Sequence, residues 1–202
     1  MLYLASRSPR RRELLARLGL DFAVLELDVP ERRLTTEDAQ AYVCRVAHDK
    51  ALAGLSSLAD QPDALVLGCD TEVVLADVVF GKPRDRADAV SMLQRLSGIE
   101  HQVISAVSLV SASRQDRAVS VSTVRFASLP EAVIQRYVDS GESFGKAGGY
   151  AIQGLAETFV ERLEGSYSGV MGLPMRHTAQ LLAGYGLGPL AADGSIDSGK
   201  AS

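Results

Sequence analysis

The run Ala64–Leu67 contains only apolar residues and leads directly into Gly68, Cys69, Asp70 and Thr71. A short apolar run next to polar and turn-forming residues is typical of a strand buried on both faces in the middle of a sheet. A similar run, Leu2–Ala5, opens the chain and is followed by a helical pattern. Single buried strands that alternate with helices predict an α/β fold with a mixed, twisted sheet flanked by helices.

The remaining elements are predicted from caps, periodicity and β-prone stretches. Helices are expected to be opened by Ser8-Pro9, Thr35–Asp38 (a capping-box pattern), Asp85, Pro130 and Pro174. Single strands are expected at Phe22–Leu27, Val73–Leu75 and Thr158–Leu163, and an antiparallel hairpin at Gln102–Val110 and Ala118–Phe126. The length favours one domain over residues 1–190, and the small and polar residues of 191–202 predict a disordered tail.

Composition excludes several classes of function. The net charge of −4 gives no overall field that would attract nucleic acid or an anionic membrane, so neither is expected as a partner. No stretch is long enough to span a bilayer. The two cysteines make no disulfide framework, which favours a cytoplasmic location.

A first candidate site lies at the start of the first helix, where Ser8-Pro9 is followed by Arg10, Arg11 and Arg12. Arginines in a first helical turn oppose the positive end of the helix dipole, and a bound anion would reverse that effect. Backbone N–H groups, a hydroxyl and guanidinium groups together are typical of a phosphate site. The alternative is that these arginines point into solvent.

A second candidate is Asp70, a carboxylate expected at the end of a buried strand, where α/β sheets usually place ligands. It could hold a divalent cation or take a proton from water, or it could satisfy backbone N–H groups in a turn. If the chain stays extended, Glu72 points away from Thr71. Lys82 follows in a tight loop.

A third candidate is the glycine-rich segment Gly145–Gly154, expected to be a loop. Its glycines would let a ligand approach the backbone, Lys146 could bind phosphate, and Gln153 could pair with the edge of a base. The alternative is an ordinary surface loop. Of the 21 basic residues only four are lysine, and three of these four lie in or beside motif-like segments of the sequence.

Four segments in this order resemble the Maf family of nucleoside triphosphate pyrophosphatases, over residue 2 to about 185. They are Leu4-Ala5-Ser6 with Ser8-Pro9-Arg10-Arg11, Asp70-Thr71 with Lys82-Pro83, Lys146–Gly154, and Gly165–Pro174. The resemblance implies two lobes with a cleft between them, an architecture similar to that of the inosine triphosphate pyrophosphatases. It also implies a divalent metal, Mg²⁺ or Mn²⁺, and a homodimer.

The resemblance further implies an activity and residue roles. The segment Ile152-Gln153-Gly154 is similar to the corresponding segment in one branch of the family. That branch hydrolyses dTTP, UTP and modified pyrimidine nucleotides to the nucleoside monophosphate and pyrophosphate. The resemblance also implies a house-cleaning role in the nucleotide pool, with a link to cell-division arrest. Asp70 would be the proton acceptor, and Arg10, Thr71 and Gln153 would govern substrate choice. The further positions expected in the cleft are Ser8, Arg11, Glu31, Lys50, Lys82 and Lys146, with Asp70 and Glu31 as expected metal ligands.

Two positions depart from the family pattern: Gly145 and Pro30 stand where acidic residues are common. If those carboxylates help to hold the metal, its affinity or the turnover would be lower. Gly145 keeps a second function open, that of a non-catalytic, nucleotide-binding regulator of septum formation. An inosine or xanthosine triphosphate pyrophosphatase of similar architecture is a further alternative.

Overall fold

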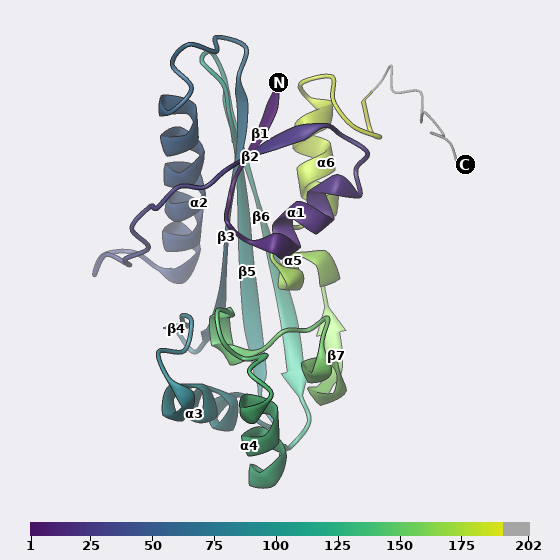
Figure 1. Cartoon of the computed structure of the whole chain (residues 1–202). Helices are drawn as coiled ribbons and strands as arrows, with labels where there is room; N and C mark the ends of the chain where they lie inside the picture. Colours follow the sequence, from purple (N-terminus) through teal and green to yellow (C-terminus); the bar gives the residue numbers. More distant parts are fainter. Residues whose placement is uncertain (192–202) are drawn as a thin grey trace.

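The computed structural model describes residues 1–191, which form a mixed sheet with the strand order β2-β1-β3-β5-β6-β7 and with β4 paired to β3 (Figure 1). The strands are β1 (Leu2–Ala5), β2 (Phe22–Leu25), β3 (Leu65–Leu75), β4 (Val78–Phe80), β5 (Glu100–Val110), β6 (Gln115–Phe126) and β7 (Val160–Glu164). The predicted α/β class and mixed sheet are confirmed. The predicted disordered tail, apart from Ala191, lies outside the described residues.

The helices are α1 (Pro9–Ala16), α2 (Ala39–Ser56), α3 (Arg86–Leu96), α4 (Glu131–Asp139), α5 (Tyr167–Met171) and α6 (Met175–Ala183), with short 3-10 turns η1 (Ala147–Gly149) and η2 (Leu155–Phe159). Ser8 and Asp85 cap α1 and α3 as predicted. The cap of α2 is Asp38, whose carboxylate accepts a hydrogen bond from the Ala41 N–H at 2.7 Å.

The central strand β3 differs from its prediction. Two separate strands were expected, but Leu65–Leu75 is continuous, because Gly68–Glu72 pair with β5 along their whole length. Asp70 therefore lies in the middle of a strand, and its predicted position at a strand end is wrong. Two short elements, β4 and α5, were not predicted, because their three and five residues are too few for a periodic pattern.

Helix α2 approaches β3 unusually closely at Gly68. A Cβ atom at this position would lie 2.1 Å from the Ala47 carbonyl oxygen and 2.6 Å from the Ala51 amide nitrogen, both in the α2 backbone. The absent side chain thus allows direct contact between the helix and the strand. This contact brings Lys50, on α2, next to the middle of β3.

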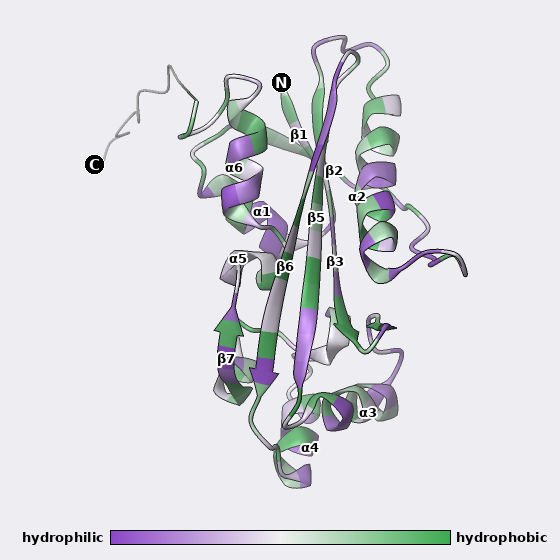
Figure 2. Cartoon of the chain, turned by 180° about the vertical axis from the view of Figure 1, so that it is seen from behind, coloured by the Kyte–Doolittle hydropathy of each residue, from purple (hydrophilic) through white to green (hydrophobic). Residues whose placement is uncertain are grey.

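The long strands β3, β5 and β6 connect two groups of helices, which correspond to the two expected lobes (Figure 1). At one end α2 covers one face of the sheet through Val43 and Val46, and α1 and α6 cover the other through Leu14 and Leu182. At the other end α3 and α4 pack around Phe126. Polar residues mark the start of β5 in Figure 2, beside α3.

Candidate active site

A short segment of β3 that is unpaired along one edge forms the floor of a cavity. Strand β1 pairs with β3 only as far as Gly68, and β4 pairs only from Val73 onward. Among the described strands, Cys69–Glu72 therefore pair with β5 alone. Because this short segment has no neighbour on its other edge, side chains from both of its faces can reach the same space.

That space is a cavity of about 860 Å³. Its volume falls in the range typical of sites for small molecules, roughly 300–1,000 Å³. Its walls come from the β1–α1 junction, residues 27–31, residues 145–153 and residues 170–172. All ten predicted site residues line it, namely Ser8, Arg10, Arg11, Glu31, Lys50, Asp70, Thr71, Lys82, Lys146 and Gln153.

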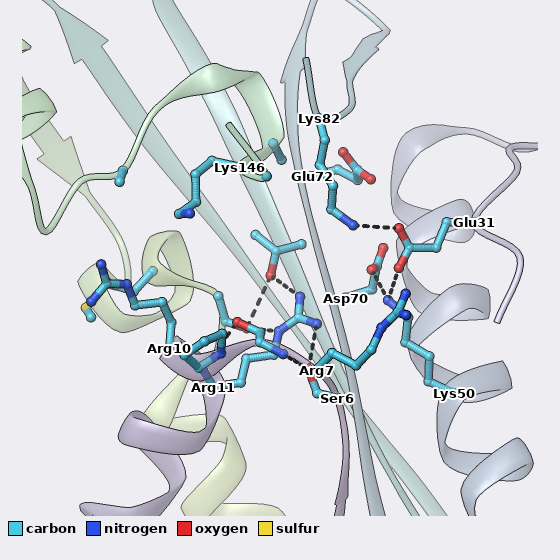
Figure 3. A pocket seen from close by; sticks show the side chains of 18 of the residues that line it. Ser6, Arg7, Arg10, Arg11, Glu31, Lys50, Asp70, Glu72, Lys82 and Lys146 are labelled. Carbon is cyan, nitrogen blue, oxygen red and sulfur yellow. Dashed lines mark hydrogen bonds and ion pairs between the residues drawn. The ribbon is translucent and has the colours of Figure 1, made fainter. Parts of the chain in front are cut away.

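One wall is basic and begins at the N-terminus of α1 (Figure 3). The first turn of this helix contains no acidic residue. Arg11 is held in place: its Nε donates to the Gly172 carbonyl oxygen at 2.9 Å and its Nη2 to Thr71 Oγ1 at 3.4 Å. Arg10 is 3.6 Å from Glu13 and is about 40% exposed, so its guanidinium group is free to turn toward an anion.

The opposite wall is a network of acids and lysines (Figure 3). Lys50 Nζ lies 2.6 Å from Glu31 Oε1 and 2.7 Å from Asp70 Oδ1. The other oxygen of Glu31 accepts a hydrogen bond from Lys82 Nζ at 3.0 Å. Burial alone would raise the pKa of Glu31, but the contacts with Lys50 and Lys82 outweigh it and lower the pKa to about 2.

Glu72 belongs to this network and was not predicted as a site residue. It follows Asp70 by two positions on β3, so the two side chains share a face. Burial raises the pKa of Glu72 to about 8, with further contributions from the charges of Asp70 and Glu31. The alternation of an extended strand already predicted that Glu72 points away from Thr71, and in the continuous strand β3 this places Glu72 on the side of Asp70.

The third wall is the segment 145–153. Gly148 has a φ of +68°, and a Cβ there would lie 2.8 Å from Val73, so the segment packs on β3 through glycine. Tyr150 and Ile152 anchor the segment in the core beside α3. Lys146 Nζ donates to the Phe144 carbonyl oxygen at 3.3 Å. Gly145 and Pro30, the two positions that depart from the pattern expected from the family resemblance, both line the cavity.

The carboxylates of Asp70 and Glu72 are suited to bind a divalent cation that enters together with a phosphate-bearing ligand. Within residues 1–191 no group of three or more His, Cys, Asp or Glu side chains is arranged to hold a metal. However, one buried oxygen of Asp70 and one of Glu72 have no hydrogen-bond partner among these residues. Mg²⁺ commonly binds through one or two carboxylates, with water and substrate phosphates as its other ligands.

Other reactive groups are excluded by their surroundings. Cys69 is buried, burial raises the pKa of its thiol, and its Sγ donates to the Gly172 carbonyl oxygen at 3.0 Å. A buried thiol of this kind is not a thiolate nucleophile. His48 contacts Ser108, whereas His101 contacts Tyr150, so these two do not form a shared site.

Among residues 1–191, no helix has the length and apolar character that a membrane span requires.

Comparisons with known proteins identify the family of this chain. The family model described as Maf-like protein matches residues 1–185. A dTTP/UTP pyrophosphatase from Xanthomonas axonopodis pv. citri is 59% identical over 188 residues, which cover 92% of this chain and 99% of that protein. A nucleoside triphosphate pyrophosphatase from Xylella fastidiosa is 58% identical over 186 residues, 92% of this chain and 98% of that protein.

Among solved structures, the Ham1 protein of Staphylococcus aureus matches with a TM-score of 0.45 and 16% identity, covering 62% of this chain and 71% of that one. This likeness is too distant to add to the argument. The family model and the two relatives span nearly the whole described chain. This chain therefore belongs to the Maf family.

Proposed function

We propose that this protein hydrolyses dTTP and UTP to the nucleoside monophosphate and pyrophosphate. The observation that carries the proposal is Asp70, which is buried at the floor of the cavity, paired with Lys50 through one oxygen and without a partner on the other among the described residues. The names of both relatives give a pyrophosphatase activity on nucleoside triphosphates, and the name of the Xanthomonas protein gives dTTP and UTP as the substrates.

The cavity offers groups for each part of a nucleotide. The triphosphate would lie between the N-terminus of α1 and the lysines Lys82 and Lys146, where the basic side chains would stabilise charge developing on the departing pyrophosphate. Gln153 has both a donor and an acceptor, as pairing with the edge of a pyrimidine requires. Arg10 and Thr71 would complete the choice of substrate.

Asp70 would act as the general base. The ion pair with Lys50 fixes the orientation of the carboxylate, so that Asp70 can accept a proton from the attacking water. A phosphate group near Lys50 and Lys82 would compete with Glu31 for these lysines. Glu31 would then be free to act as the second predicted metal ligand beside Asp70.

When bound, Mg²⁺ or Mn²⁺ would neutralise phosphate charge and polarise the phosphoryl group that water attacks. We also infer that residues 1–190 form one catalytic domain. A cytoplasmic location stays a prediction from the cysteine content. A homodimer, the action on modified pyrimidine nucleotides and the link to cell-division arrest stay predictions of the family resemblance.

A nucleotide panel tests the proposal. Purified protein with Mg²⁺ or Mn²⁺ is expected to release pyrophosphate from dTTP and UTP. Asp70→Asn should fold normally and lose this activity by about 10²-fold or more. Asp139→Asn, which alters a surface ion pair with Arg86, is the matched control and should retain it.

Two other outcomes would replace the proposal. Preferential release of pyrophosphate from inosine or xanthosine triphosphate would indicate a pyrophosphatase specific for purine nucleotides. Binding of UTP without release of pyrophosphate under either metal would indicate a regulator. Full activity of Asp70→Asn would remove Asp70 from the catalytic role while leaving the reaction in place.

A further inference from the structure

Asp70 and Glu72 project from the same face of β3 into the cavity, and both are almost completely buried. Their exposed fractions are 4% and 7%. Asp70 Oδ1 is bound by Lys50, whereas Asp70 Oδ2 and Glu72 Oε2 have no hydrogen-bond partner within residues 1–191. Figure 3 shows Glu72 beside Lys82, Asp70 and Glu31.

Folding alone does not explain Glu72. A buried carboxylate oxygen without a partner destabilises a fold, and an apolar side chain would serve better where only packing is required. The nearby lysines do not pair with Glu72, because Lys50 contacts Glu31 and Asp70, and Lys82 contacts Glu31. Three carboxylates thus share two lysines, and Glu72 is the acid left without a contact to either of them.

The partner that this arrangement lacks is a cation. Two carboxylate oxygens without partners, two residues apart on one strand, are hard oxygen donors suited to Mg²⁺ or Mn²⁺. The phosphates of a nucleotide in the same cavity would provide further oxygen ligands. We propose that Glu72 is a direct ligand of the divalent cation that enters with the nucleotide, and that it shares this cation with Asp70. The inference rests on the proposed function only in its choice of a nucleoside triphosphate as the accompanying ligand.

The test measures metal binding rather than turnover. Binding of Mn²⁺ is followed by electron paramagnetic resonance, alone and with a UTP analogue whose α–β bridging oxygen is replaced by a methylene group. Glu72→Gln should weaken Mn²⁺ binding to the protein with the analogue by at least about tenfold. Glu161→Gln, at an exposed ion pair with Arg125 on the sheet, is the matched control and should bind Mn²⁺ like the unchanged protein.

A second variant separates ligation from a general effect of charge. Glu72→Asp keeps the negative charge but withdraws the carboxylate by one methylene group. A direct ligand loses its contact, so Glu72→Asp should also bind Mn²⁺ more weakly. Wild-type affinity in Glu72→Asp would overturn the proposal, because it would reduce Glu72 to a distant charge.

Thermal unfolding provides the control for folding. Without Mn²⁺ and nucleotide, Glu72→Gln should be at least as stable as the unchanged protein, because it replaces a buried carboxyl group whose Oε2 has no hydrogen-bond partner within residues 1–191. If Glu72→Gln fails to fold, Glu72→Asp carries the test. Wild-type Mn²⁺ affinity in the folded variants would overturn the inference.

The two proposals fail separately. If the unchanged protein releases pyrophosphate from UTP and the Glu72 variants bind Mn²⁺ normally, only the inference about Glu72 is wrong. If Mn²⁺ binding depends on Glu72 but no pyrophosphate is released from UTP or dTTP, only the proposed function is wrong.

Discussion

At the scale of single residues, the network of acids and lysines in the site contains fewer lysines than carboxylates, and a single lysine contacts more than one acid. Lys50 is only 11% exposed and contacts two carboxylates at once, Glu31 and Asp70. The sequence placed Lys50 in the cleft through family resemblance, but it could not predict these partners. The contact with Asp70 depends on how α2 packs against β3, and no local pattern records that packing.

His101 allows a test of pH dependence away from the proposed metal ligands. Burial lowers its pKa from 6.5 to about 4, and its Nε2 lies 2.9 Å from the Tyr150 hydroxyl. The unfolded chain takes up the proton near pH 6.5, whereas the folded protein does so only near pH 4. The stabilising contribution of neutral His101 is therefore complete above pH 6.5 and is lost as the pH falls toward 4.

We expect this loss to reach about 3 kcal/mol, from the size of the pKa difference. His101→Gln should remove the corresponding slope from the free energy of unfolding, measured by urea titration between these pH values. Parallel slopes in the variant and the unchanged protein would contradict the assignment.

At the scale of elements, most helices and strands were predictable, because each has a cap or an apolar pattern of sufficient length. Strand β3 was divided in two, since its polar stretch from Asp70 to Glu72 breaks the apolar run. Pairing with β5 keeps this stretch extended despite its polarity. Alternation predicted that Glu72 points away from Thr71 in an extended chain, but with Asp70 placed at a strand end this did not assign Glu72 to the site.

The contact between α2 and β3 predicts the effect of a single methyl group. Gly68→Ala would place a Cβ atom 2.1 Å from the Ala47 carbonyl oxygen, so the helix backbone must move away. We expect a loss of about 1–3 kcal/mol in the free energy of unfolding, as is typical of overpacking. Because Lys50 lies on the same helix, pyrophosphate release should fall as well.

Gly81→Ala is the matched control, since no atom lies within 4 Å of the Cβ it would add. Urea unfolding and the pyrophosphate assay measure the two effects. Equal stability of Gly68→Ala and the unchanged protein would show that α2 does not lie as close to β3 as the structure places it.

At the scale of the whole molecule, the cavity draws its walls from both groups of helices. The β1–α1 junction and α2 belong to one end, and the segment 145–153 is anchored at the other beside α3. Long strands connect the two ends (Figure 1). The family resemblance predicted a cleft, but the open edge of β3 that forms its floor follows from where β1 ends and β4 begins.

A nucleotide that touches both ends should stabilise the entire fold. At about one hundred times its dissociation constant, a ligand that binds only the folded state adds about 2.7 kcal/mol. For a chain of this size we therefore expect the methylene analogue of UTP with Mg²⁺ to raise the unfolding temperature by roughly 5–10 °C. At the same concentration UMP should give a smaller shift, because it lacks the phosphates that would contact Lys82, Lys146 and the N-terminus of α1. Chelation of the metal with EDTA should reduce the shift given by the analogue. Equal shifts with UMP and the analogue in differential scanning fluorimetry would mean that the basic walls do not bind the phosphates.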